Sequence, residues 1–219
     1  MAYQFATSPA ISYLSCASAP NWHSTDYFTL SVRCRILESS SSYQNLVMLN
    51  HSSGNAYFLR LYNYNGQYWP QFVSMRESTT YSVTCTSSFS TTDATWHHIL
   101  AIVNRPQSTI YVNLDGGNLT SQGDVKFPAD SPSTMQFGLV YPNGMNGELA
   151  EIALWNQPVG LLSAAQRSAH GQGFRPMTIT PQYLLGYWPL VRELHDLVGG
   201  NHLAAYESPV VVAHPPVIG

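Results

Sequence analysis

The sequence contains little charge. Its 219 residues include 9 Lys and Arg and 12 Asp and Glu, a charged share of 10%, compared with about 25% in ordinary soluble domains. Lys126 is the only lysine, and a net charge of −3 leaves no basic stripe. Nucleic acid is therefore not an expected partner, because phosphate recognition needs clustered basic side chains. The surface must consist largely of Ser, Thr, Asn, Gln, Tyr and Gly.

Long hydrophobic runs and paired cysteines are also missing. The apolar run that begins at Ile99 is far too short to cross a bilayer, so membrane insertion is not expected. Cys16, Cys34 and Cys85 are odd in number and show no CxxC spacing. We therefore predict buried free thiols and neither a disulfide framework nor a zinc site.

The dominant hydrophobic period is two. In "FTLSVRCRIL", residues 28–37, apolar and polar side chains alternate, which predicts a half-buried strand. Asn65-Gly66 divides residues 56–75 into a β-hairpin. Further strands are expected at 45–50, 81–86, 96–103, 109–115, 135–140, 147–155 and 183–190.

A single helix interrupts this pattern. The segment "LLSAAQRSAHGQG", residues 161–173, is rich in Ala, Leu and Gln, and Gly171 is placed to end the helix. Nine to twelve short strands with one helix near the C-terminus predict an all-β protein, an antiparallel two-sheet jelly-roll sandwich. We expect one domain over residues 1–205. The apolar, Pro-rich tail over 206–219 is expected to pack on this protein or on a partner.

Two adjacent histidines stand in "TWHHILAIVNRPQSTIYVNLDGG", residues 95–117. Neighbouring residues on a strand face opposite sides, so His97 and His98 are badly placed to chelate one metal ion. We interpret the stretch as a hairpin, with His98 packed beside Trp96 and His97 on the sheet surface. Trp96, His98, Trp155 and Trp188 are predicted to belong to the structural core.

The same stretch resembles the central hairpin of laminin-G-like and concanavalin A-like jelly rolls. "GELAEIALWNQPVGLLSAAQ" is similar to the closing strand and short helix of that family, and "LLGYWPL" followed by "DLVGGNHL" looks like the C-terminal edge of its bacterial and phage members. The resemblance extends from about Phe5 to Leu203. It implies the jelly-roll fold, which is known to serve lectins, adhesion modules, hydrolases and virion proteins, so function has to be argued from a site.

No catalytic motif is found. The glucan-cleaving members of the superfamily carry closely spaced acids on one strand face, because hydrolysis needs two opposed carboxyl groups. Glu148 and Glu151 are three residues apart, and a regular strand sends them to opposite faces. We therefore expect a protein that is not an enzyme, with a glycoside hydrolase as the weakest alternative.

Calcium has only weak support. Some relatives bind Ca²⁺ at the rim of a sheet, and Asp26 and Asp115 are the candidate ligands here. No dense acidic loop is present, however, and both residues are typical of turns. We expect no cofactor.

A binding surface is better supported, because the chain has 14 Tyr and 5 Trp. Tyr62, Tyr64, Tyr68 and Trp69 surround the Asn65-Gly66 turn and are the candidate ligand-binding residues. Trp22 and Tyr141 also lie in loop-rich surroundings. Aromatic rings stack on the apolar faces of sugars, although the same residues suit protein interfaces.

Two functions from different classes remain open. The first is a structural protein of a virion, a capsid decoration or cement protein of a phage, with capsid proteins and further copies of itself as partners and cell-surface glycans as possible ligands. It rests on a surface suited to the outside together with an N-terminus, "MAYQFATSPAISYL", that lacks the features of a signal peptide. Such a protein would be assembled in the host cytoplasm. The second is a secreted carbohydrate-binding or adhesion module, which would be extracellular.

Overall fold

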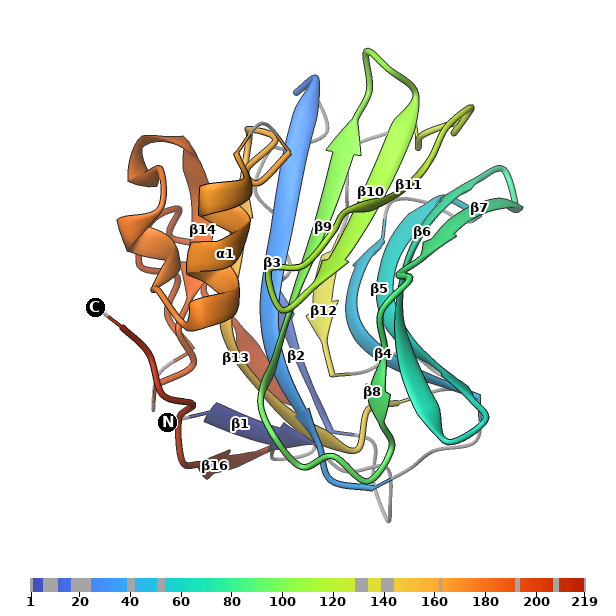
Figure 1. The fold of residues 1–219 in the computed structure, drawn as a ribbon. Coiled ribbons are helices and arrows are strands. Elements are labelled where there is room, and N and C mark those ends of the chain that lie inside the picture. Colours follow the sequence, from blue (N-terminus) through green and yellow to red (C-terminus); the bar gives the residue numbers. More distant parts are fainter. Residues whose placement is uncertain are drawn as a thin grey trace.

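A computed structural model gives the fold of the chain (Figure 1). It describes residues 2–5, 12–16, 25–38, 42–50, 54–128, 134–138, 144–161, 163–191, 194–206 and 209–218.

Two antiparallel sheets pack face to face (Figure 1). In spatial order, sheet A contains β11 (Thr120–Gln122), β10 (Thr109–Leu114), β9 (His97–Asn104), β3 (Tyr27–Ile36), β13 (Gly147–Trp155), β1 (Ala2–Phe5) and β16 (Val210–Val212), with β14 (Leu184–Trp188) also paired to β13. Sheet B contains β15 (Ala204–Tyr206), β2 (Tyr13–Cys16), β12 (Thr134–Phe137), β4 (Tyr43–Asn50), β5 (Ala56–Tyr64), β6 (Gln67–Arg76) and β7 (Thr79–Thr84), with β8 (Phe89–Ser90) also paired to β6. The predicted jelly-roll sandwich is confirmed.

The main core fills the space between the sheets. Alternating side chains of β3, among them Phe28 and Val32, meet the inward-facing residues of sheet B. The Phe28 ring, for example, meets the Tyr57 ring edge to face at a centroid distance of 5.1 Å, a geometry that aromatic pairs favour. All three cysteines are free and buried in this core, as predicted.

The outer face of sheet A is covered as well. The helix α1 (Ala164–Gln172) and the short 3₁₀ helices η1 (Pro176–Thr178) and η2 (Pro181–Tyr183) lie beside this face (Figure 1). Consequently every residue of β9 and β13 is buried, as expected for strands that are packed on both faces. Trp155 lies in this second core with Val159, Ile179 and Tyr187.

The helix ends two residues later than the sequence suggests. Ser163 caps its first turn, and Gly173 ends it with a φ of 100°, in the left-handed region that favours glycine. Gly171 serves another purpose. A Cβ there would come within 2.5 Å of the Asp115 carbonyl oxygen, so a glycine lets the helix pack closely on the turn after β10.

The predicted hairpin over residues 56–75 is confirmed as β5 and β6. Asn65 and Gly66 have φ values of 50° and 73°, the pair of positive angles that a two-residue type I′ turn requires. The strands that sequence patterns missed are the shortest ones: β1, β2, β8, β11 and β16 have four residues or fewer. A period-two pattern needs more residues than that.

The described part of the C-terminal tail lies on the domain. Strand β16 pairs with β1, with Val211 opposite Tyr3, and Ile218 forms a β-bridge with Phe174. The division of the chain at residue 205 stays a prediction. No helix in the described part of the chain is long and apolar enough to span a membrane.

Candidate functional site

The outer face of sheet B carries a row of aromatic rings. In the strand register, Tyr43 of β4 lies opposite Tyr62 of β5, and Tyr62 lies opposite Trp69 of β6. The Tyr43 and Tyr62 rings stack with centroids 5.2 Å apart, and Tyr64 stacks on Tyr62 at 6.1 Å. Tyr64 is exposed, and the other three side chains are half-buried.

A row of polar side chains lies beside the aromatic row and is displaced from it by two residues along each strand. Arg60 of β5 lies opposite Gln71 of β6, which lies opposite Thr84 of β7. Arg60 Nε donates to Gln71 Oε1 at 2.8 Å, and Gln71 Nε2 donates to Thr84 Oγ1 at 2.8 Å. Each amide atom of Gln71 thus makes one hydrogen bond within the row, which orients the side chain and leaves each atom a second acceptor or donor position.

Arg60 connects the two rows. Its guanidinium carbon lies 4.0 Å from the centroid of the Tyr43 ring, within cation–π range. Burial lowers the pKa of Arg60, and the nearby Tyr43 opposes that shift. Even a lowered arginine pKa leaves the group charged at neutral pH. We call Tyr43, Arg60, Tyr62, Tyr64, Trp69 and Gln71 the aromatic face.

The chemistry of the aromatic face suits recognition. Flat rings offer stacking surface, and the adjacent row offers amide, guanidinium and hydroxyl groups for hydrogen bonds. The strands β5 to β7 are curved along their length (Figure 1), so the outer side of sheet B is concave there.

The structure brings together three of the four predicted ligand-binding residues. Tyr62, Tyr64 and Trp69 lie on the aromatic face, but the prediction for Tyr68 is wrong. Tyr68 points into the core between the sheets, where its hydroxyl accepts a hydrogen bond from Gln44. Trp22 and Tyr141 lie outside the described residues.

Both adjacent histidines, His97 and His98, are buried, and each makes its own contacts. His97 was expected on the sheet surface, but Phe89 stacks on its ring at 3.9 Å, and its Nδ1 lies 2.8 Å from Asp115 Oδ2. His98 packs under α1, where its ring stacks on His170 at 5.0 Å and its Nε2 lies 2.8 Å from Ser31 Oγ.

Burial lowers the pKa of both stacked histidines. The pKa of His98 falls well below its usual value because of burial and then because of His170 and Arg33. Burial, together with the positive charge of Arg33, lowers the pKa of His170 to about 3. Both rings are thus neutral near pH 7. They pack as aromatic side chains and not as proton carriers.

Trp155 and Trp188 are fully buried, whereas Trp96 is not. The Trp155 indole donates to the Ile179 carbonyl, and the Trp188 indole donates to the Asn201 carbonyl. Trp96 is half-buried, because it precedes β9 and lies beside the guanidinium of Arg35 at 5.5 Å and not within either core.

Glu148 and Glu151 do not point to opposite faces, contrary to expectation. The pairing of β13 with β3 shifts between Ala150 and Ala153, and Glu151 has a φ of 51°. This bulge turns Glu151 to the outer side of sheet A, the side that Glu148 also faces.

The bulge does not create an acid pair of the hydrolase type. Arg35 donates to both carboxylate oxygens of Glu148, at 2.7 and 2.8 Å. Glu151 accepts a hydrogen bond from the Tyr187 hydroxyl, and His214 Nε2 lies 2.8 Å from its other oxygen. Both carboxylates are 2% exposed. Each is therefore held by its own partners.

Asp26 and Asp115, the candidate calcium ligands, have different surroundings. Both carboxylate oxygens of Asp115 have partners within the fold. Oδ1 accepts a hydrogen bond from the backbone N–H of His98 at 2.7 Å, and Oδ2 contacts the His97 ring. Asp26 is exposed, and no cluster of three or more His, Cys, Asp or Glu side chains is found among the described residues. Calcium binding at these residues therefore stays untested.

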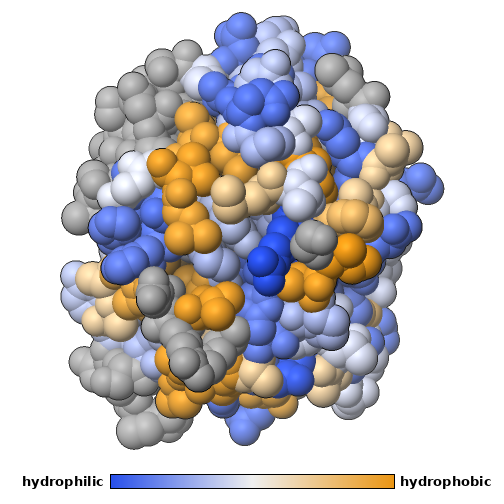
Figure 2. Space-filling view, turned by 90° about the vertical axis from the view of Figure 1, so that its left-hand side faces the viewer, coloured by the Kyte–Doolittle hydropathy of each residue, from blue (hydrophilic) through white to orange (hydrophobic). Residues whose placement is uncertain are grey.

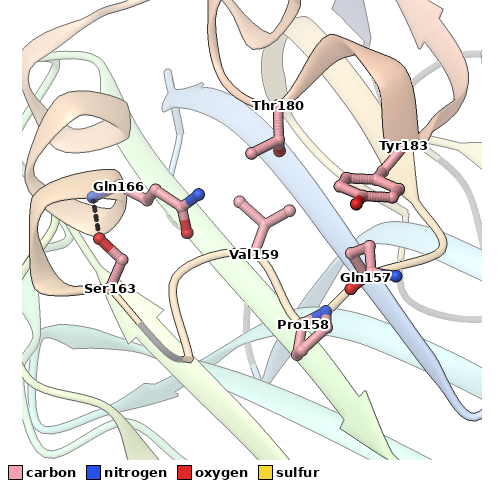
Figure 3. A pocket seen from close by; sticks show the side chains of 7 residues that line it. All are labelled: Gln157, Pro158, Val159, Ser163, Gln166, Thr180 and Tyr183. Atoms are coloured by element: carbon pink, nitrogen blue, oxygen red, sulfur yellow. Dashed lines mark hydrogen bonds between the residues drawn. The ribbon is translucent and has the colours of Figure 1, made fainter.

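A shallow hollow lies at the start of α1, away from the aromatic face (Figure 3). Seven residues line it: Gln157, Pro158, Val159, Ser163, Gln166, Thr180 and Tyr183. Its polar groups are partly used in the fold, since Ser163 Oγ accepts from the Gln166 backbone N–H and Gln166 Oε1 accepts from Gly160.

The two antiparallel sheets and their strand order define a jelly-roll sandwich. Residues 10–165 match the family described as the concanavalin A-like lectin/glucanases superfamily. The chain belongs to this superfamily. No curated protein sequence matches the chain.

Solved structures show the same fold at low sequence identity. A heptameric SAP-like pentraxin from Limulus polyphemus has a TM-score of 0.68 and 12% identity, with 97% of this chain and 94% of that chain covered. A proposed carbohydrate-binding protein from Bacteroides ovatus has a TM-score of 0.62 and 14% identity, with 97% and 61% covered. A tailspike protein of an Escherichia coli bacteriophage has a TM-score of 0.58 and 12% identity, with 84% and 26% covered. This chain thus spans less than two thirds of the last two.

Proposed function

We propose that the protein is a non-enzymatic recognition module that binds glycans on the aromatic face. The observation that carries this proposal is the row of Tyr43, Tyr62 and Trp69 on neighbouring strands, in which Tyr43 and Tyr62 stack, beside the polar row of Arg60 and Gln71. Aromatic rings that remain partly open on a sheet surface do not contribute their full area to folding, so that area is available to a ligand.

The face favours neutral, hydroxyl-rich ligands. Sugar rings have apolar C–H faces that stack on Tyr and Trp, and their hydroxyls match amide and hydroxyl partners. Arg60 supplies the single formal charge of the face, and it is already bonded to Gln71 and stacked on Tyr43. A strongly charged ligand would find little further compensation there.

Glycan binding can be measured by isothermal titration against laminarin, starch and mannan with the full chain. We expect at least one of these to bind, and Tyr62→Ala and Arg60→Ala to abolish that binding. Tyr206→Ala is the matched control, because Tyr206 is an exposed tyrosine of the same sheet that stacks on Tyr13 away from the aromatic face. No binding to any of the glycans, or equal loss in the control, contradicts the proposal.

The absence of catalysis is part of the proposal. Glu148 and Glu151 are buried and engaged by Arg35, Tyr187 and His214, whereas glycoside hydrolysis needs two carboxyl groups open to the scissile bond. We expect no release of reducing sugar from the bound glycan. Turnover that disappears in Glu148→Gln or Glu151→Gln would establish a hydrolase instead.

We further propose that the module works on the surface of a virion, as a decoration or cement protein. An exterior that is rich in hydroxyl and amide groups, with one lysine in 219 residues, suits a protein exposed outside cells. A phage tailspike shares the fold. Several exposed apolar residues near the C-terminus offer docking surface.

The virion proposal is tested by immuno-electron microscopy of particles released by the culture that produces the protein. Regular labelling of capsids or tails is the expected result. Label confined to cell surfaces or to free protein in the medium would favour the secreted adhesion module, and glycan binding would then remain as a separate property.

A further inference from the structure

A cavity lies on the outer side of sheet A, where η1 and the segment after β14 meet the bulge of β13. Its volume is about 420 Å³, compared with about 180 Å³ for the hollow at the start of α1. This volume falls within the range of about 300–1,000 Å³ that is usual for small-molecule sites. The lining combines apolar side chains with two charged residues, Glu151 and Arg175.

The walls of this cavity are apolar and partly open to water. They include Met177, Pro189, Val191 and Leu197. The Met177, Val191 and Leu197 side chains are 43%, 42% and 54% exposed. Figure 2 shows apolar areas on the side of the molecule that carries β14, with hydrophilic residues between them. A ligand with an apolar body would remove these walls from water, which favours its binding.

The negative charge of the lining already has partners within the fold. Glu151 and Tyr187 are each 2% exposed. The Tyr187 hydroxyl donates to Glu151 Oε2, and His214 Nε2 lies 2.8 Å from Glu151 Oε1. The buried side chain of Arg33 also interacts electrostatically with Glu151. A cationic ligand is therefore not needed to compensate this carboxylate.

The positive charge of the lining, in contrast, is available. Arg175 is exposed, and its guanidinium makes no hydrogen bond or ion pair with the described residues. Its charge acts inside the cavity, because burial and Glu151 raise the pKa of the Tyr187 hydroxyl while Arg175 opposes that shift. A guanidinium stays charged in proteins, and its planar fork matches the two oxygens of a carboxylate.

We propose that this cavity binds a small apolar carboxylic acid in its ionised form, with the hydrocarbon part of the ligand against the apolar walls and its carboxylate on Arg175. The proposal goes beyond glycan recognition and does not depend on it, because the aromatic face lies on the outer side of sheet B.

The charges of the lining distinguish this ligand class from its neutral and cationic counterparts. A carboxylate gains charge-assisted hydrogen bonds with Arg175. An alcohol of the same length contacts the same walls but leaves the guanidinium without a counter-charge. An ammonium group would face the uncompensated charge of Arg175, whereas the oxygens of Glu151 are already engaged. Affinity should therefore decrease from carboxylate to alcohol to ammonium.

Isothermal titration of the full chain with octanoate, hexanoate, octanol and octylammonium tests this order. We expect one octanoate per chain and at least about tenfold weaker binding of octylammonium. Hexanoate should also bind about tenfold more weakly than octanoate, because each buried CH₂ contributes about fourfold in affinity. Absence of octanoate binding, equal affinity for octanoate and octylammonium, or equal affinity for the two acids would each overturn the proposal.

Two variants connect the ligand to its two proposed contacts. Arg175→Gln should lower octanoate affinity about tenfold and leave octanol affinity unchanged. Leu197→Glu should abolish octanoate binding, because it places a negative charge on an apolar wall. Val198→Glu is the matched control, since Val198 is the next residue, is 43% exposed and is not part of the lining.

All three variants change exposed residues and should keep the melting temperature and the glycan affinity of the parent. Equal loss of octanoate binding in Leu197→Glu and Val198→Glu contradicts the proposed site, as does an unchanged preference for octanoate over octylammonium in Arg175→Gln. Glycan titration of the same samples tests the aromatic face separately, so failure of one proposal leaves the other standing.

Discussion

The two outer faces of the sandwich use similar residues in opposite ways. The outer face of sheet A is roofed by α1 and the segments after it, and it buries Trp155, His98 and Glu151. The outer face of sheet B has no such cover in the described residues, and its Tyr62 and Trp69 remain partly open. Aromatic and polar side chains thus hold the fold together on one face, whereas on the other they stay partly open to solvent.

This contrast predicts that equivalent substitutions have unequal effects. A side chain on the roofed face has no solvent to replace its lost contacts, so its removal leaves a cavity or an unpaired group. A side chain on the open face is replaced by water. Stability should therefore respond mainly to the first face, and ligand binding to the second.

The largest effect is expected for Trp155→Ala. The indole is fully buried and donates to the Ile179 carbonyl at 3.1 Å, so its loss should lower the free energy of unfolding by about 3–5 kcal/mol. Urea unfolding measures this value. Trp69→Ala on the aromatic face is the control and should cost clearly less, and equal losses would remove the distinction between the faces.

The next effect is expected where a buried carboxylate loses its partner. Arg35→Ala leaves the Glu148 carboxylate without its two hydrogen bonds. The pair is partly screened because the Arg35 side chain is 30% exposed, so we expect a loss of about 2–4 kcal/mol. Arg76→Ala breaks the exposed Arg76–Glu77 pair and should cost at most about 1 kcal/mol. A comparable cost for both variants would contradict this assignment.

A third effect is a loss of stability in acid. The pKa of His170 is about 3 in the fold and 6.5 when unperturbed, and the pKa of His98 is lowered in the same direction. The unfolded chain therefore binds more protons between these two values, and stability falls as the pH falls from 6.5. For His170 alone the loss between pH 7 and pH 5 is about 2 kcal/mol.

Urea unfolding at pH 7, 6 and 5 measures this dependence. The variant His170→Gln has no proton to gain in this range and should show a shallower pH dependence than the wild type. Equal slopes in the two proteins would mean that the stacked histidines are not the groups responsible.

The sequence predicts the open face better than the roofed face, for a physical reason. Strand β5 has one side that is partly open to water, and its period shows in the sequence because alternate residues meet solvent. Strand β3 shows the same alternation, but it is not half-buried as predicted, because its polar side chains Thr29, Ser31 and Arg33 are buried as well. Strand β13 is buried on both sides, so its pattern does not reveal which side each residue faces. The bulge at Glu151 depends on how β13 pairs with β3, and the local sequence does not predict it.

The side of the sheet to which Tyr68 points follows from the turn that precedes it. A two-residue turn at Asn65-Gly66 pairs Tyr64 with Gln67, and therefore Tyr62 with Trp69. Alternation then sends Tyr68 to the other side of the sheet. The position of Tyr43 beside Tyr62 could not be predicted in this way. It depends on which strand pairs with β5, and the sequence does not specify that strand.

The smallest effect on stability, and the largest on binding, is expected for Tyr62→Ala. Tyr62 is half-buried and contacts Tyr43 and Tyr64 by ring stacking, and a cross-strand pair of this kind contributes about 1 kcal/mol or less. The unfolding free energy should therefore change little while glycan affinity is lost, as titration of the same sample shows. If Tyr62→Ala lowers the free energy of unfolding as much as Trp155→Ala does, the aromatic face stabilises the fold in the same way as the outer face of sheet A. The proposed difference between the two faces would then be wrong.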